Sequence, residues 1–178
     1  QGGKLHDLKV IGVAGGEDKC KFAVEELGFD QCIDHRADDF EEQLAAACPN
    51  GIDIYYENVG GRVFDAVLPL LNAHARIPVC GLAAHYNETE LPEGKDRLSL
   101  LMSNILRKRL TMKGFIIFEE YSDHFPEYLQ TMGEWVSEGK VKTKEHIVDG
   151  LQNAPQGFVD MLYGNNFGKT VVKVADPK

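Results

Sequence analysis

Apolar residues fall into two alternating patterns, short continuous runs and longer segments with apolar residues at helical spacing. The short runs predict strands over residues 8–14, 31–34, 51–61, 75–82 and 110–118. The helical spacing predicts helices over residues 19–27, 38–48, 64–71, 98–108, 125–139 and 155–163. An extended segment is expected over 141–148 and a last strand over 170–174. Strands that alternate with helices of this length predict βαβ units, and so an α/β fold with a mainly parallel sheet.

The strand over residues 51–61 ends in the sequence Glu57-Asn58-Val59-Gly60-Gly61. In an open α/β sheet, ligands bind at the carboxyl ends of the strands. Asn58 is therefore a candidate cofactor contact, although Asn before Gly also closes ordinary turns. The polar loop over residues 83–95, which follows the next strand, is a second candidate because long loops at strand ends are often functional. Pro78 lacks an N–H and predicts an irregularity in its strand.

Composition narrows the class of protein. A net charge of −9 makes nucleic acid an unfavourable partner. The sequence has no apolar run long enough to span a bilayer and no signal segment at the start. Its four cysteines include no Cys-x-x-Cys pair, which indicates a reducing, cytoplasmic setting. Cys80 lies in an apolar run and is expected to be a small core residue. Six scattered histidines without ligand spacing predict no metal site.

A phosphate-binding glycine loop of the Gly-x-Gly-x-x-Gly or Walker type does not occur in the sequence. The first strand ends instead in Gly15-Gly16, with no acidic residue where NAD-preferring folds hold the ribose hydroxyls. Lys19 follows closely, and Arg36 is a weaker cationic candidate. The absence of an acid beside a cation favours NADP over NAD, although an isolated helix lysine is more often simply solvated.

Four motifs in order carry a resemblance to a known family: residues 10–16 (VIGVAGG), 57–61 (ENVGG), 79–81 (VCG) and 166–169 (NFGK). With them the whole chain resembles the zinc-independent medium-chain dehydrogenase/reductases. It is most similar to the NADPH-dependent curcumin reductase and leukotriene B4 12-hydroxydehydrogenase group. The resemblance implies a Rossmann-like doubly wound parallel sheet lacking its first strand and glycine loop. It also implies the carboxyl half only, with residues 1–141 as the NADP-binding domain and 142–178 as a segment returning to the catalytic domain.

The resemblance also implies site residues. The expected cofactor contacts are Lys19, His35, Asn58, Cys80, Gly81, Tyr86, Phe115, Ile116, Ile117 and Asn166. Lys19 corresponds to a lysine at the adenosine 2′-phosphate, whereas His35 stands where many members have a tyrosine. Tyr86 corresponds to a position near the substrate oxygen and is the expected catalytic hydrogen-bond donor.

The function hypothesis is NADPH-dependent reduction of the C=C bond of α,β-unsaturated ketones or aldehydes. Two alternatives stay open at this point, a catalytically inactive nucleotide-binding module and a methyltransferase-like α/β domain, because one layer pattern serves several nucleotides. A homodimer is expected, with the apolar strand over residues 110–118 as an edge that could pair between copies.

Overall fold

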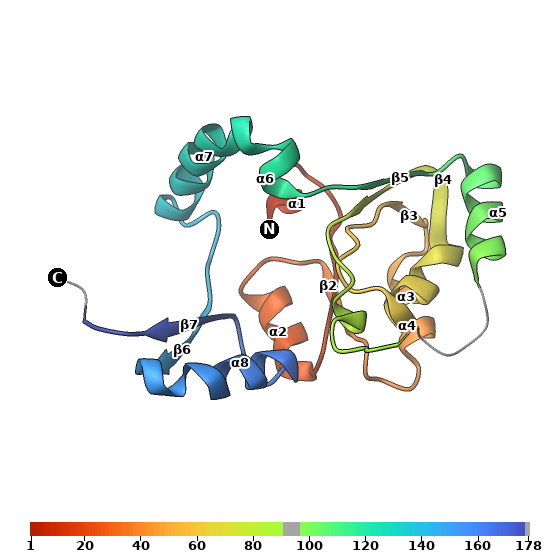
Figure 1. Cartoon of the computed structure of the whole chain (residues 1–178). Helices are drawn as coiled ribbons and strands as arrows, with labels where there is room; N and C mark the ends of the chain where they lie inside the picture. Colours follow the sequence, from red (N-terminus) through yellow and green to blue (C-terminus); the bar gives the residue numbers. More distant parts are fainter. Residues whose placement is uncertain (91–96, 177–178) are drawn as a thin grey trace. The chain divides into compact units, whose positions relative to one another are not determined.

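The computed structural model describes residues 1–90 and 97–176 (Figure 1). They form two compact units, a terminal unit of Gln1–Cys32 with Leu129–Lys178 and a central unit of Ile33–Tyr128. The predicted boundary after residue 141 separates regions by their expected role, whereas these units are defined by compactness. The boundary therefore stays a prediction. Residues 91–95 of the loop predicted over 83–95 lie outside the described residues.

The terminal unit carries a two-stranded parallel sheet near its end. Its elements are α1 (Gly2–Leu5), β1 (Ile11–Ala14), α2 (Glu17–Glu25), most of α7 (Phe125–Ser137), β6 (Glu145–Asp149), α8 (Ala154–Leu162) and β7 (Lys169–Lys173). β6 and β7 pair in parallel, with Glu145 opposite Lys169. α8 lies beside this pair (Figure 1), and Gly157 of α8 allows close approach because an added Cβ would lie 2.9 Å from the Val148 side chain. β1 pairs with β2 (Gln31–Asp34).

The central unit is built around a three-stranded parallel sheet in the order β3-β4-β5. Its helices and strands are α3 (Phe40–Ala47), β3 (Ile52–Ile54), α4 (Gly61–Val67), β4 (Leu71–Val79), α5 (Leu98–Lys108), β5 (Thr111–Gly114) and α6 (Ile117–Glu120). Short 3-10 turns cover Leu68–Leu70, Ala83–His85, Ser122–His124 and Leu151–Asn153, the last in the terminal unit. α5 lies beside β4 (Figure 1). The parallel pairing that the sequence predicted is present here.

The core of the central unit lies between its helices and the middle strand. Phe40 of α3 is fully buried, and Ile77 of β4 is 1% exposed. Val67, Leu68 and Leu71 continue the apolar surface from α4 into β4 and are also buried. Burial of such side chains contributes about 1.5–3 kcal/mol each, so this cluster stabilises the packing of the helices on the sheet.

The irregularity expected at Pro78 lies elsewhere in the strand. Pro78 pairs regularly with Lys113 of β5. On the other side of β4, Ile52 is opposite Leu71 but Ile54 is opposite Arg76, so three extra residues are accommodated between them. His74 lies in this bulge with φ of 64°, a conformation uncommon outside glycine. The missing N–H of Pro78 is therefore not the cause of the bulge.

The strand predicted over 110–118 is shorter than expected. β5 ends at Gly114, and α6 begins at Ile117. Phe115 packs edge-on against Tyr121 with ring centroids 5.9 Å apart, and Lys113 pairs with Glu120 at 3.0 Å. These contacts favour a chain reversal, whereas a short apolar run alone does not distinguish a strand from a helix.

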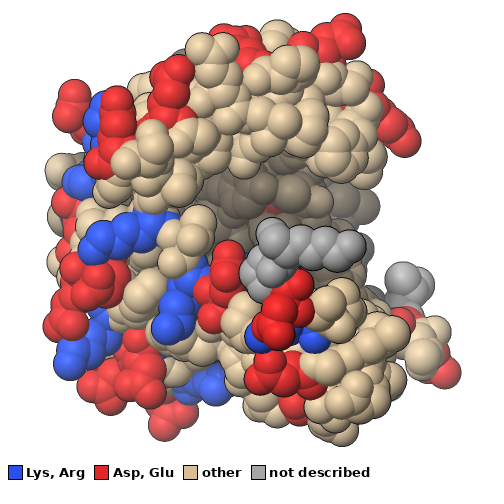
Figure 2. Space-filling model, turned by 90° about the vertical axis from the view of Figure 1, so that its left-hand side faces the viewer, with Lys and Arg blue, Asp and Glu red and all other residues tan. Residues whose placement is uncertain are grey.

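Charged residues of both signs share the surface. On the face shown in Figure 2, Lys and Arg side chains lie among Asp and Glu side chains rather than in a separate basic patch. In the part of the chain that the structure describes, no helix is both long enough and apolar enough to cross a membrane. The four cysteines are not joined by disulfide bonds.

Candidate functional site

The carboxyl ends of β3 and β4 are joined by backbone hydrogen bonds beyond the regular strands. The Cys80 N–H donates to the Glu57 carbonyl at 2.8 Å. Ala83 and Ala84 donate to the carbonyls of Asn58 and Val59 at 3.0 and 2.8 Å. The turn after β3 and the loop after β4 therefore form one surface at the edge of the sheet.

Three of the predicted residues meet on this surface. A Cβ added to Gly81 would lie 2.5 Å from the Tyr86 hydroxyl oxygen and 2.7 Å from Asn58 Oδ1. Both polar atoms thus lie against the bare Cα of Gly81, a space that any other residue would fill. Asn58 and Tyr86 are exposed, Tyr86 to 66%. A hydroxyl and an amide oxygen beside a side-chain-free backbone are available to bind a planar polar ligand.

Glu57 supports this surface from below, and the sequence did not single it out. Its side chain is 1% exposed. Oε1 accepts hydrogen bonds from the N–H groups of Val59 at 2.7 Å and Gly60 at 2.8 Å, whereas Oε2 is buried and has no hydrogen-bond partner among the described residues. Burial and the Glu57 charge raise the pKa of Tyr55. The sequence signal that could have identified Glu57 was an acidic residue at the end of an apolar strand, directly before Asn-Val-Gly-Gly.

Cys80 is exposed, so the prediction that it is a core residue was wrong. It comes directly after β4 ends at Val79, and there the chain leaves the buried sheet. The pKa of Tyr56 is raised to about 12, mainly by a hydrogen bond with Cys80 and to a smaller extent by burial. The thiol therefore lies at the same edge as Gly81.

The third strand contributes Phe115 to this edge. Its N–H donates to the Val79 carbonyl at 3.3 Å, one residue beyond the last pair of β4 and β5. Ile116 and Ile117 are 60% and 54% exposed. They do not form the predicted strand edge, since Ile116 precedes α6 and Ile117 is its first residue.

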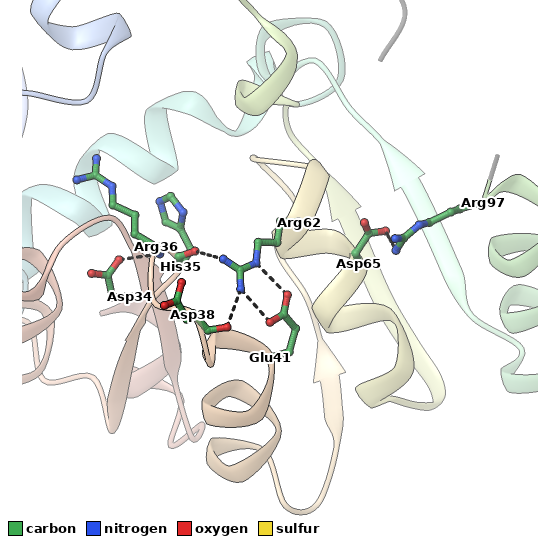
Figure 3. Close-up of polar contacts among 8 residues, drawn as sticks. All are labelled: Asp34, His35, Arg36, Asp38, Glu41, Arg62, Asp65 and Arg97. Carbon is green, nitrogen blue, oxygen red and sulfur yellow. Dashed lines mark hydrogen bonds and ion pairs between the residues drawn. The ribbon is translucent and has the colours of Figure 1, made fainter. Parts of the chain in front are cut away.

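His35 lies on the loop after β2, where an arginine links this loop to α4 (Figure 3). Arg62 donates from Nε and Nη2 to the two oxygens of Glu41, both at 2.9 Å. It also donates to the carbonyls of His35 at 3.2 Å and Asp38 at 3.3 Å. This fork lowers the pKa of Glu41 to about 2. The loop carrying His35 is thus held against the start of α4.

The His35 ring itself is half-buried. Burial, with the charges of Arg36 and Arg62, lowers the pKa of His35. A neutral imidazole suits contact with an uncharged ring. The Arg36 side chain points away from Arg62 (Figure 3).

In the terminal unit, Lys19 lines a cavity of about 400 Å³ together with residues 12–14 at the end of β1. Its ammonium donates to the Gly164 carbonyl at 2.8 Å. Phe22 and Phe167 form an aromatic wall, with ring centroids 5.3 Å apart. The volume falls within the range of small-molecule sites.

Asn166 lies close to this cavity rather than on its lining. Its Nδ2 donates to the Gly168 carbonyl at 2.7 Å, and Gly168 lines the cavity. Lys144, which the sequence did not single out, also lines it. The predicted residues therefore separate into a central-unit group and a terminal-unit group.

Among the residues that the structure describes, no three His, Cys, Asp or Glu side chains are grouped so as to hold a metal ion. The absence of a metal in the function of this chain stays a prediction.

Comparison with known proteins defines the class. The family described as zinc-binding dehydrogenase matches residues 1–134, so the chain belongs to this family. Over 97% of its length it is 62% identical to a protein of Escherichia coli named NADPH-dependent curcumin reductase, covering 50% of that protein. The crystal structure of CurA from Vibrio vulnificus in complex with NADPH matches 98% of the chain and 52% of the CurA chain, with 58% identity and a TM-score of 0.94.

The E. coli quinone oxidoreductase complexed with NADPH matches at 16% identity and a TM-score of 0.74, a likeness of fold alone. These matches confirm the predicted Rossmann-like fold class and the resemblance to the curcumin reductase group. The chain spans about half the length of the relatives it matches.

Proposed function

We propose that this chain forms the NADP(H)-binding part of an oxidoreductase that reduces the C=C bond of α,β-unsaturated ketones and aldehydes. The observation that carries the proposal is the meeting of Asn58, Gly81 and Tyr86 at the carboxyl edge of a parallel sheet. The name of the E. coli relative and the NADPH in the CurA structure support it.

The residues present fit this cofactor. At Gly81 the absence of a side chain leaves the backbone open between two polar side chains. Around Lys19, the cavity wall offers an ammonium group and aromatic surface, which suits a phosphate joined to an apolar ring. When bound, NADPH supplies the hydride that adds to the β-carbon of the substrate.

The chain's own contribution is to orient the substrate and to stabilise charge. After hydride addition, negative charge develops on the carbonyl oxygen of the substrate, and a positioned donor lowers the energy of that state. We assign this role to the Tyr86 hydroxyl. Asn58 Oδ1 lies beside the same Cα as that hydroxyl.

Replacing Tyr86 by Phe, in an enzyme that contains this chain, is expected to lower kcat about 100-fold, as loss of one such donor does elsewhere. Steady-state kinetics with an enone and NADPH measure the effect. Tyr128→Phe is the matched control, because Tyr128 is a 52% exposed tyrosine that stacks on Phe125. An unchanged kcat in Tyr86→Phe would remove Tyr86 from the mechanism.

Two alternatives are separated by titration calorimetry on the 178-residue chain. Micromolar NADPH binding with enone turnover excludes an inactive nucleotide-binding module, whereas binding without turnover supports it. Binding of S-adenosylmethionine in place of NADPH would support the methyltransferase-like domain.

We further propose a cytoplasmic location and a homodimer. Four cysteines without a disulfide bond support a reducing compartment. β5 is the last strand in the order β3-β4-β5, and its four residues are exposed. An exposed sheet edge can pair with a second copy.

A further inference from the structure

Two lysines, Lys19 and Lys144, line the terminal-unit cavity together with the aromatic pair Phe22 and Phe167. Lys19 and Phe22 are three residues apart on α2 and so share a face of the helix. Phe22 meets Phe167 edge-on. The Lys144 ammonium lies 5.6 Å from the centroid of the Phe167 ring. All four side chains line the same cavity.

The charge of this lining is unbalanced. Among the described residues that line the cavity there is no Asp or Glu. A third lysine there, Lys142, is paired with Glu26 at 2.8 Å, whereas Lys19 donates to a neutral carbonyl. An ammonium has three donors, so Lys19 can bind that carbonyl and an anion together. Lys19 is part-buried, which strengthens its attraction for an anion, whereas Lys144 is exposed.

Hydrogen bonds fix the backbone around Lys144. The Gln1 side-chain amide donates to the Lys142 carbonyl at 2.9 Å and accepts from the Lys142 N–H at 2.7 Å. The Lys169 N–H donates to the Lys144 carbonyl at 2.8 Å. Gly168, with φ of 99°, lies so close that an added Cβ would clash with that carbonyl. These contacts fix the backbone from which the exposed Lys144 side chain extends.

We propose that Lys144 is a second phosphate ligand of this cavity and, on the basis of the proposed function, determines preference for NADP over NAD. Lys19 and Lys144 bind the 2′-phosphate of the adenosine from two walls, and the Phe22–Phe167 pair provides the apolar surface beside it. The recognised chemistry is a phosphate monoester attached to an aromatic nucleoside.

The test compares the affinities of the chain for adenosine 2′,5′-bisphosphate, adenosine 5′-monophosphate and inorganic phosphate by calorimetry. Lys144→Met keeps the length of the side chain and removes its charge. It is expected to weaken binding of the bisphosphate about tenfold or more, as loss of one charge-assisted hydrogen bond does, and to leave binding of the monophosphate unchanged. Lys144→Arg is expected to retain the preference for the bisphosphate.

Lys142→Met is the matched control, because Lys142 lines the same cavity but is paired with Glu26. Equal bisphosphate affinity in Lys144→Met and the unaltered chain would overturn the assignment of Lys144 alone. An equal loss in Lys142→Met would also overturn it, since any lysine would then suffice. If the unaltered chain binds neither nucleotide, the nucleotide part of the proposed function fails together with this inference. Inorganic phosphate bound as tightly as the bisphosphate would exclude the nucleoside as the ligand.

Discussion

At the scale of single residues, Glu57 shows how a buried carboxylate can organise a turn. Its Oε1 satisfies the N–H groups of Val59 and Gly60 just before α4 begins. Without this acceptor the buried Gly60 N–H would have no partner, which is costly in an apolar setting, and the part-buried Val59 N–H would lose its bond. The carboxylate therefore fixes the path of the turn that carries Asn58.

Removing the Glu57 side chain with Glu57→Ala is expected to lower the free energy of unfolding by about 2–5 kcal/mol, because two donors lose their acceptor. Glu57→Gln keeps an acceptor oxygen and is expected to have a much smaller effect. Urea unfolding of the three proteins measures both changes. Equal losses in the two variants would mean that the hydrogen bonds to the turn are not the source of the stability.

The ion pair between Glu41 and Arg62 gives a prediction about acid stability. The folded-state pKa of Glu41 is about 2, below its ordinary value of 4.5. The unfolded chain therefore binds the proton more tightly, so the contribution of Glu41 is present above its ordinary pKa and is lost as pH falls toward 2. Between about pH 5 and about pH 3, the stability difference between the unaltered chain and Glu41→Gln is expected to shrink, as measured by urea midpoints.

Glu25→Gln controls for the loss of one negative charge, because Glu25 is exposed and lies 4.0 Å from Lys21. Its difference from the unaltered chain is expected to change little over the same pH range. A parallel decline in both variants would trace the effect to net charge rather than to the Arg62 fork.

At the scale of elements, the start of β7 depends on a glycine. Gly168 has φ of 99°, and an added Cβ would clash with the Lys144 carbonyl, which accepts the Lys169 N–H. Any other residue would have to adopt an unfavourable conformation and also displace the segment before β6. This glycine therefore determines how closely the two strands of the β6–β7 pair begin.

Gly168→Ala is expected to destabilise the chain by about 1–3 kcal/mol, the range for a residue held in such a backbone conformation. Thermal unfolding measures the change. Gly133→Ala is the control, since Gly133 lies inside α7 with open space around it and Ala favours a helix. If both substitutions stabilise the chain, close approach at Gly168 is not required.

At the scale of the whole molecule, the exposed edge of β5 is where the proposed homodimer can be tested. Met112 lies in this strand and is 38% exposed. A lysine at a sheet edge opposes pairing with a second copy. Met112→Lys is therefore expected to shift the chain from dimer to monomer in analytical ultracentrifugation.

Leu151→Lys adds the same charge at a 67% exposed position outside this sheet and is expected to leave the dimer unchanged. A dimer that persists in Met112→Lys would exclude the β5 edge as the interface.

The sequence by itself determined the class of fold and the strand ends at which the candidate site lies. α5 has the predicted bounds, 98–108, because helical apolar spacing extends over its whole length. Asn58 was expected at the edge of the sheet because ligands bind at the carboxyl ends of parallel strands, whereas Gly81 was expected there only from the family resemblance. The order and type of helices and strands follow from local sequence patterns, so they can be predicted without knowledge of tertiary contacts.

Only the tertiary structure decided which of these residues are fixed by hydrogen bonds and which residues distant in the sequence lie beside them. The role of Glu57 follows from the loop after β4, which is hydrogen-bonded to the turn that Glu57 supports. Lys144 was identified because Phe167 and Gly168, in the segment before β7, lie against it. Cys80 proved exposed although it follows an apolar run. Burial and charge pairing depend on residues distant in the chain, so local patterns do not determine them.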